Sequence, residues 1–418
     1  MSFVADLHLH SSYAYATSSA LTLDNLASCA RLKGIDLLAT ADFTHPLWLQ
    51  RLKDSLDEGP DGAYRYSDVN FVMGTEVSCV FKQDGRGRRV HLLIYAPDIA
   101  TAEALTEQYA RYGNIQSDGR PTLSLSARDA VYLTLDTNPD CLVVPAHAWT
   151  PWYGIFGSKS GFDSLSDAFG DMVGHVPAIE TGLSSDPQMN WQVPDLEDKA
   201  IVSFSDAHSL PRLGRELTIF QGEPTFLGLQ QGLTHNRVEF TVEMYPEEGK
   251  YHFDGHRKCG VSWHPDHSIR EGDACPQCGR PLTLGVLHRS LNLQSAGDEA
   301  QSGRPQTFSN ASAASLPANA VLSEAGRPPF VRMVPLVDII SAVLGRGPNT
   351  KGVQRIYINV VSAAGSELRA LLGATESELA AIGGEALASA IIKVRAGDIQ
   401  VEPGYDGVYG KVSIPIST

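Results

Sequence analysis

The stretch Val4-Ala5-Asp6-Leu7-His8-Leu9-His10 lies almost at the N-terminus and has the alternation of a half-buried β-strand. Residues i and i+2 of a strand point to the same face, so His8 and His10 are placed to bind one ion. Asp206 and His208 repeat this spacing two hundred residues later, directly after an apolar run. Each pair therefore predicts two metal ligands at the end of one strand.

Three further donors, Glu76, His91 and His147, adjoin short apolar runs between these pairs. A single histidine after a strand is more often a hydrogen-bonded structural residue, but seven such donors make coincidence a poor explanation. Ligands that follow successive strands are typical of a barrel with a metal centre at its C-terminal rim. The donor set predicts a multi-metal site for Zn, Mn or Mg, in which Glu76 is able to bridge two ions.

The composition is that of an ordinary globular protein. With 418 residues, 43% hydrophobic and 19% charged, the chain has room for one large domain and smaller ones. No apolar stretch of spanning length and no basic-then-apolar leader is found, so we expect a cytoplasmic protein without a membrane partner. A net charge of −15 argues against a protein that coats DNA non-specifically, although it does not exclude a nucleic-acid substrate.

Hydrophobic patterns divide the chain into five parts. Residues 1–225 alternate strand-like and helical patterns, which predicts a parallel, barrel-like α/β domain. Residues 226–249 form a connector with one strand, 250–290 a compact cysteine-containing unit, and 291–326 a flexible, Ser- and Gly-rich linker or insert. Residues 327–418 are mainly helical. The helices are expected at 336–344, 353–363, 367–372 and 376–395, and in the barrel domain at 23–33 and 101–112.

The cysteine unit predicts a structural zinc site. Cys275-x-x-Cys278 follows His256-x-x-Cys259, each pair has a two-residue gap, and a glycine follows each second ligand, as a tight turn requires. His256 fits best as the fourth ligand. The alternatives are His252, His264 and His267. A redox role for the Cys-x-x-Cys pair lacks a thioredoxin-like context. Arg257 and Lys258 flank the unit and are candidates for phosphate contacts, with a solvated basic rim as the alternative.

A Gly- and Pro-rich aromatic loop follows His147. Trp149, Trp152 and Tyr153 suit stacking on a planar ring, and Ser158-Lys159 suit phosphate binding through backbone N–H groups and a cation. The alternative is a structural lid. A second basic segment, with Lys82, Arg86, Arg88 and Arg89, predicts a hairpin tip near the substrate path.

The donor series His8-x-His10, Glu76, His91, His147 and Asp206-x-His208 resembles the PHP (polymerase and histidinol phosphatase) superfamily. This resemblance implies a distorted (β/α)7 barrel with up to three metal ions at its C-terminal rim. The chain most resembles the endonuclease Q family, because the resemblance extends to the aromatic loop, the stretch 205–216, the cysteine unit and the tail 403–411. Only the 295–326 insert is not covered.

The resemblance also implies a division of the ligands. One ion would be held by His8, His10, Glu76 and Asp206, and a second by Glu76, His91 and His147. A third would use His45 and His208, with Asp42 or Glu180 as further contacts. The chain departs from the superfamily here, because Ala41-Asp42-Phe43 replaces the usual Thr-Asp-His, and His45 is the candidate replacement for the missing histidine.

The expected function follows from this resemblance. It is metal-dependent endonucleolytic DNA repair, with cleavage of the phosphodiester bond 5′ to deaminated bases (uracil, hypoxanthine, xanthine) or abasic sites. Two or three divalent ions in the barrel and one structural zinc are expected, in a nucleoid-associated monomer. A sliding clamp is a further candidate partner, although the tail contains no clear clamp-binding peptide. The rival interpretations are a small-molecule phosphoesterase and a catalytically inactive DNA-binding PHP protein.

Overall fold

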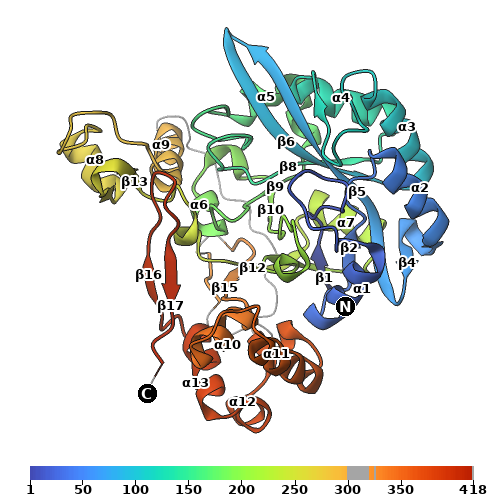
Figure 1. Ribbon diagram of the computed structural model, residues 1–418. Helices are drawn as coiled ribbons and strands as arrows, with labels where there is room; N and C mark the ends of the chain where they lie inside the picture. The colour runs from blue at the N-terminus through green and yellow to red at the C-terminus, as the bar shows by residue number, and fades with distance from the viewer. Residues whose placement is uncertain (299–319, 324–325, 417–418) are drawn as a thin grey trace.

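The computed structural model describes residues 1–298, 320–323 and 326–416. Figure 1 shows a large α/β body that includes the N-terminus, a small module around residues 250–290, and a group of C-terminal helices. A hairpin near the C-terminus extends from these helices back to the small module.

Seven strands of the described chain form a ring, as the sequence predicted for its barrel. In order, they are β1 (Ser2–Asp6), β2 (Leu37–Ala39), β5 (Val69–Gln83), β6 (Arg86–Ala96), β8 (Leu142–Pro145), β9 (Ala178–Glu180) and β10 (Ala200–Val202). Two junctions are closed beyond the strand ends. Ala148 N donates to Glu180 O over 2.9 Å between β8 and β9, and Leu9 bridges Ala207 between β1 and β10.

The ring is not wholly parallel, which corrects the expectation. Strand β6 is antiparallel to both β5 and β8, because a turn at Asp84 and Gly85 joins β5 directly to β6 and parallel strands need a longer crossover. The turn has the positive φ angles of a tight hairpin, 50° and 74°. The predicted basic hairpin tip is confirmed. Glu76 pairs with Leu93 inside this ladder, so it lies within a strand and not after one.

Helices surround the ring (Figure 1). They are α1 (Leu23–Lys33), α2 (Pro46–Ser55), α3 (Ile99–Tyr109), α4 (Ala127–Thr137), α5 (Leu165–Phe169), α6 (Pro187–Trp191) and α7 (Phe226–Thr234). Helix α1 has the predicted bounds because its caps are local. The Thr22 side chain accepts from Asn25 N, and Gly34 ends the helix at φ 84°.

Further strands extend the sheet on the side of β1. Strand β11 (Leu217–Gln221) pairs antiparallel with β1, and β12 (Val238–Glu243) pairs with β11. Strand β15 (Phe330–Arg332) pairs parallel with β12, so the C-terminal part begins as an edge strand of the barrel's sheet. The short strands are β3 (Asp57–Glu58), β4 (Tyr64–Tyr66) and β7 (Thr122–Leu123), and the 3-10 turns are η1 (Pro60–Gly62), η2 (Gly170–His175), η3 (Pro194–Leu196), η4 (Leu210–Arg212), η5 (Pro246–Glu248) and η6 (Arg257–Cys259).

The small module contains β13 (Asp254–His256), β14 (Val261–Trp263) and α8 (Pro265–Glu271). Helix α9 (Val286–Asp298) follows it and corrects the expected start of the linker at 291. Its apolar residues Val286 and Leu293 are buried, and this packing favours the helix over a linker. Residues 299–319 and 324–325 of the expected linker lie outside the described residues.

The C-terminal helices are α10 (Leu336–Leu344), α11 (Lys351–Ala364), the π-helical turn η8 (Arg369–Gly373), α12 (Glu376–Gly383) and α13 (Glu385–Arg395). One helix was expected over 376–395, but Gly384 divides it, since its φ of 87° is incompatible with a continuous right-handed helix. The hairpin of β16 (Gln400–Glu402) and β17 (Lys411–Ser413) ends the described chain. Among the described residues, no helix has the length and apolar character needed to span a bilayer.

A buried ion pair joins the C-terminal helices to the barrel. Lys33 Nζ at the end of α1 lies 2.7 Å from Glu367 Oε2, and both side chains are almost fully buried. The same carboxylate accepts from Tyr357 Oη over 2.6 Å and from Leu336 N over 3.1 Å. One carboxylate thus joins groups from α1, α10 and α11.

Replacement of Glu367 by Gln should lower the free energy of unfolding by about 3–5 kcal/mol, since it leaves the Lys33 ammonium buried without a counter-ion. Urea titration followed by circular dichroism measures this. Glu385→Gln, at an exposed position, is the matched control. A loss below about 1 kcal/mol in Glu367→Gln would show that the pair does not hold the two parts together.

His252 predicts a pH-dependent stability. Burial lowers its pKa from 6.5 to about 4, so the unfolded chain binds more protons than the folded one between these values. The contribution of His252 to the free energy of unfolding is therefore fully present above pH 6.5. It is lost as the pH drops toward 4, by up to about 1.4 kcal/mol per pH unit. Unfolding of His252→Gln and of the unaltered chain between pH 4.5 and 7.5 isolates this contribution. Parallel stability curves for the two proteins would contradict it.

Candidate metal centre

The first donor group lies where β1 and β10 leave the ring. His8, His10, Glu76 and Asp206 present donor atoms that all lie within 4.8 Å of one another. Glu76 Oε2 lies 3.5 Å from His8 Nε2 and 3.3 Å from His10 Nε2, and Asp206 Oδ1 lies 3.4 and 3.3 Å from the same atoms. Two ligand atoms at about 2.1 Å from one tetrahedral ion are about 3.4 Å apart. The spacing is that of ligands around a common ion.

The hydrogen bonding supports this interpretation. His8 Nε2, His10 Nε2 and Asp206 Oδ1 are buried and have no hydrogen-bond partner. Buried polar atoms are rarely left unpaired without a reason such as an ion. The four donors therefore fit a divalent metal ion in chemistry as well as in spacing.

The second group shares Glu76. Its Oε1 lies 2.6 Å from His91 Nδ1 and 3.2 Å from His147 Nε2, and these two nitrogens are 3.2 Å apart. One carboxylate oxygen thus faces each group, so Glu76 is placed to bridge two ions. With three protein ligands, the second group leaves a coordination position for water or substrate.

Two buried carboxylates orient the imidazoles from behind. Glu180 lies 2.9 and 3.0 Å from His8 Nδ1 and also accepts from His147 N over 2.6 Å. Asp42 lies 3.1 Å from His10 Nδ1 and accepts from the N and Oγ of Ser11. Each carboxylate directs the Nε2 of its histidine toward the donor group. Asp42 was predicted as a metal ligand, but no group of three or more close donors among the described residues includes it, so this role stays a prediction.

The predicted third set of ligands is not assembled in the described chain, where no group of three or more close donors includes His45 or His208. His45 is the N-cap residue of α2, and its Nε2 lies 3.2 Å from the Gln116 carbonyl. His208 stays at the edge of the first group. Its ring centre is 4.5 Å from that of His10, and its Nδ1 lies 3.0 Å from the Asp206 carbonyl.

The ionisable groups of the two donor groups influence one another's charge. Burial disfavours charge on His8, but Glu180, Asp206 and Glu76 hold its pKa well above the usual value, and carboxylates raise the pKa of His10 likewise. Burial also opposes ionisation of Glu76, whose pKa is nevertheless held well below normal by His91 and Arg120. A cluster of buried anions thus requires nearby positive charge, which protons or metal ions supply.

Sequence reasoning missed three residues of the centre. Arg120 Nη1 lies 3.1 Å from Glu76 Oε2, and no sequence motif around Arg120 predicts this contact. Asp6 accepts from Ser205 N and Gly214 N, so it joins both ends of the loop that carries Asp206. Arg215 Nε donates to the Ser205 carbonyl over 2.7 Å. Asp6 precedes His8 by two residues, and this proximity was the available signal.

The aromatic loop after His147 only partly matches its prediction. Trp149 is buried and donates to Asn190 Oδ1 over 2.7 Å, so it is a core residue and not a stacking surface. The ring centre of Tyr153 lies 4.3 Å from that of His91, at the second donor group. Trp152 is 44% exposed.

The Ser158-Lys159 segment is a turn folded on its own loop. Lys159 N donates to the Pro151 carbonyl and Gly161 N to the Gly157 carbonyl, over 3.0 and 2.8 Å. The N–H groups of Lys159 and Gly161 are therefore not directed at a ligand, and phosphate binding by Ser158 and Lys159 stays a prediction. The side chains of Ser158 and Lys159 are exposed.

A separate donor group lies in the small module. His256, Cys259, Cys275 and Cys278 have donor atoms within 4.8 Å of one another, and His256 Nδ1 lies 3.4 Å from Cys278 Sγ. The burial of the Cys275 thiol opposes its ionisation, but N–H groups of Gln277 and Cys278 lower its pKa to about 6. Gly260 and Gly279 have φ angles of 64° and 71°, as the two turns require.

The module has only a small apolar core of its own. Its separate apolar cluster consists of Val261, Cys275 and Leu282, with Cys259 and Trp263 packed against it. Such a cluster is too small to fold a segment of this length without a further constraint. Arg257 and Lys258 are exposed beside His256.

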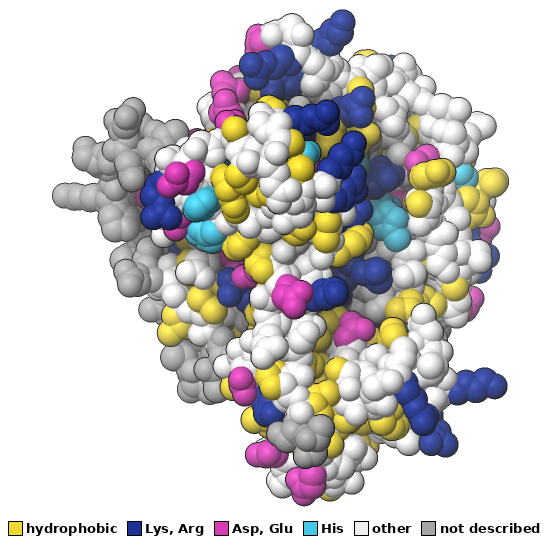
Figure 2. Space-filling view, turned by 60° about the vertical axis from the view of Figure 1, so that its left-hand side comes forward, with side chains coloured by type: hydrophobic (Ala, Val, Ile, Leu, Met, Phe, Trp, Pro, Cys, Tyr) yellow, Lys and Arg dark blue, Asp and Glu magenta, His cyan; other side chains and the backbone are white. Residues whose placement is uncertain are grey.

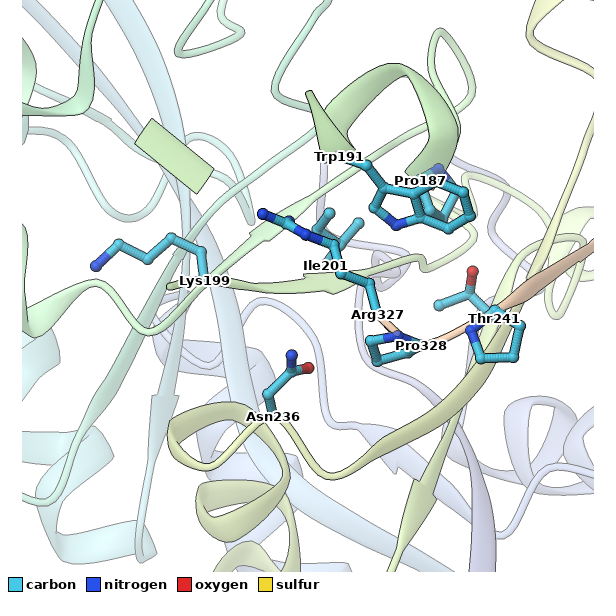
Figure 3. A pocket seen from close by; sticks show the side chains of 9 residues that line it. Pro187, Trp191, Lys199, Ile201, Asn236, Thr241, Arg327 and Pro328 are labelled. Carbon is cyan, nitrogen blue, oxygen red and sulfur yellow. The ribbon is translucent and has the colours of Figure 1, made fainter. Parts of the chain in front are cut away.

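Figure 2 shows Lys and Arg side chains in the middle of the face that carries the module, around a hollow in which histidine is visible. The hollow in Figure 3 is a different one. It is lined by residues such as Trp191, Asn236 and Arg327, and includes none of the metal donors.

Comparisons with known proteins give the following matches. A family model described as the MJ0043 C-terminal domain matches residues 335–398. The uncharacterised protein MJ0043 of Methanocaldococcus jannaschii is 30% identical over 275 residues, which are 64% of this chain and 31% of that protein. This chain thus matches about a third of that relative's length. The uncharacterised protein YqxK of Bacillus subtilis (strain 168) is 26% identical, with 98% of each chain covered.

Two solved structures match almost the whole chain. The lesion-specific endonuclease PfuEndoQ from Pyrococcus furiosus has a TM-score of 0.82 at 30% identity, covering 99% of this chain and 96% of that one. Endonuclease Q in complex with a 27-mer duplex substrate, with an abasic lesion at the active site, has a TM-score of 0.81 at 30% identity. That match covers 99% of this chain and 97% of the other.

Replacement of Glu180 by Gln should weaken divalent metal binding by about 10–100-fold, because His8 loses the carboxylate that sets its tautomer and orientation. Isothermal titration with Mn²⁺ or Zn²⁺ measures the affinity. Glu107→Gln, on the exposed face of α3, is the control. Unchanged affinity in Glu180→Gln would mean that the donors are held by the backbone alone.

Proposed function

Because the chain belongs to the endonuclease Q family, we propose that it is a metal-dependent DNA repair endonuclease. It hydrolyses the phosphodiester bond on the 5′ side of deaminated bases (uracil, hypoxanthine, xanthine) or abasic sites. The observation that carries this proposal is the convergence of two donor groups on the shared carboxylate of Glu76, in a chain that matches a lesion-specific endonuclease over its whole length.

The barrel performs the chemistry in this proposal. Two divalent ions, when bound, activate a water molecule and neutralise charge on the phosphate oxygens. His8, His10 and Asp206 hold one side of the centre, His91 and His147 the other, and Glu76 joins them. Glu180 and Asp42 keep the imidazoles aligned.

Two side chains at the rim complete the reaction. Arg120 is partly exposed beside Glu76, so its guanidinium is placed to contact a phosphate oxygen and stabilise developing charge. His208 faces the Asp206 carbonyl with Nδ1, which leaves Nε2 to accept a proton from the attacking water. The water oxygen then forms a bond to phosphorus, and the bond from phosphorus to the 3′ oxygen breaks. The leaving 3′ oxygen takes up a proton from solvent, so the products carry a 3′-hydroxyl and a 5′-phosphate.

Lesion recognition is proposed to use base extrusion, which is easier for a mispaired or missing base. Tyr153 lies beside His91, and the Arg89 guanidinium is 5.8 Å from the centre of the Tyr153 ring, so both can line the entrance to the centre. The module and the C-terminal helices would hold the duplex by its phosphates, without reading sequence. Arg257 and Lys258 are the proposed contacts of the module.

The expected substrate range separates this proposal from its rivals. In the presence of Mn²⁺, Mg²⁺ or Zn²⁺, the protein should nick duplexes that contain uracil, hypoxanthine or an abasic site, and leave the undamaged duplex intact. Turnover of small phosphate esters alone would favour a phosphoesterase. Binding of damaged duplex without cleavage under any of these metals would favour an inactive DNA-binding protein.

Asp206→Asn should lower the nicking rate by at least about a hundredfold, since it removes an anionic ligand of the first donor group. Denaturing gels of end-labelled abasic duplex measure the rate and the cleavage position. Glu107→Gln serves again as control. Full activity of Asp206→Asn would separate this centre from the reaction.

We also propose that His256, Cys259, Cys275 and Cys278 hold one structural zinc ion. Cys275→Ser should then lose one equivalent of zinc in metal analysis, and trypsin should cut the module at Arg257, Lys258 or Arg270 at least about tenfold faster, because zinc binding supplies the folding free energy of such units. Cys29→Ser, outside the module, should keep its zinc. Unaltered zinc content in Cys275→Ser would contradict the assignment.

A further inference from the structure

Three segments that are far apart in the sequence meet on one exposed surface, which we call the aromatic ridge. Its residues are Trp152, Lys250, Tyr251, Arg257 and Tyr409. They come from the loop after β8, the start of the module and the tip of the β16–β17 hairpin. Figure 2 views the molecule from the side of the module and hairpin, and shows hydrophobic and basic side chains interleaved there.

Contacts between the segments make the ridge continuous. The ring centres of Trp152 and Tyr251 are 6.0 Å apart, edge to face. A Cβ atom on Gly407 would lie 3.2 Å from Arg257 Nη1 and 3.8 Å from Tyr251 Oη, so both side chains lie against the hairpin tip. Lys250 Nζ lies 4.8 Å from the centre of the Tyr409 ring.

The ridge is rigidly supported although its rings are exposed. Asp406 accepts from Arg257 N over 2.6 Å and from Thr283 Oγ1 over 2.7 Å, which ties the hairpin to the module. Arg289 on α9 donates to the Phe156 and Phe162 carbonyls, which ties the module to the aromatic loop. Trp152 and Tyr409 remain 44% and 65% exposed in this frame. Exposed aromatic rings on a rigid frame, next to cations, are suited to a ligand with both flat apolar faces and negative charge.

The position of the ridge indicates which part of the DNA it binds. Trp152 adjoins Tyr153, whose ring lies 4.3 Å from His91. The cleaved phosphate and the extruded nucleotide must lie at the donor groups, so the ridge borders the place where the duplex has lost one base. The base opposite the lesion has lost its pairing partner there, so it is the base available for stacking on the ridge.

We propose that the aromatic ridge binds the base left unpaired opposite the lesion, with Trp152 stacked on its face and Lys250 and Arg257 on the adjacent phosphates. This inference rests on the proposed function and extends it to the undamaged strand. Base–aromatic stacking is tolerant of sequence, since every base has a π-face. It compensates for the pairing that extrusion breaks, so Trp152 favours the extruded state only in a duplex.

The test compares duplex with single strand. Trp152→Ala should lower the ratio of duplex to single-strand cleavage rates by about tenfold for a uracil-containing substrate, whose base pair must be broken on extrusion, measured in single turnover. Trp152→Phe should restore most of this ratio, because it keeps a stacking ring. Tyr132→Ala, an exposed aromatic residue on α4, is the matched control.

A second readout does not depend on cleavage. With 2-aminopurine placed opposite the abasic site, binding of the unaltered protein should quench the fluorescence, and Trp152→Ala should remove at least half of that quenching. Quenching lost in Trp152→Ala supports the ridge even if no substrate is cut, in which case only the proposed function fails. Unchanged quenching in Trp152→Ala would overturn the proposal that the ridge binds the opposite base, and so would equal loss of duplex and single-strand cleavage. Either result is expected if the ridge instead binds a partner protein.

Discussion

The carboxylate of Glu76 is the interaction on which the rest of the centre depends. One oxygen faces His8 and His10, and the other faces His91 and His147. A fully buried anion in such a place is tolerated only with positive charge on both sides. The ring of strands places four imidazoles around the Glu76 side chain.

This arrangement requires unusual backbone geometry. His147 and Asp206 have φ angles of 31° and 45°, a region that side chains with a Cβ seldom adopt. The strain at Asp206 is stabilised by its surroundings. Asp6 holds both ends of its loop and Arg215 donates to the adjacent carbonyl. Backbone strain at a metal centre, supported by a buried polar network, is typical of a preorganised site.

The parts of the molecule are joined by a few charged side chains. Glu367 joins the C-terminal helices to α1, Asp406 joins the terminal hairpin to the module, and Arg289 joins the module to the aromatic loop. Each of these side chains pairs with groups more than a hundred residues away in the sequence. These contacts hold the C-terminal helices, the module and the terminal hairpin against the barrel.

Contacts between residues close in the sequence produce the local elements and the paired donors. Helix α1 has its predicted bounds because its caps are adjacent residues, and His8-x-His10 and Cys275-x-x-Cys278 place ligands together by spacing alone. Other features of the site depend on how distant segments pack. Packing places Asp42 beside His10, buries Trp149 and brings Arg120 to Glu76, and it also assembles the aromatic ridge. The reason is physical: caps and ligand pairs depend on neighbours within a few residues, whereas burial and second contacts depend on which distant segment packs against the site.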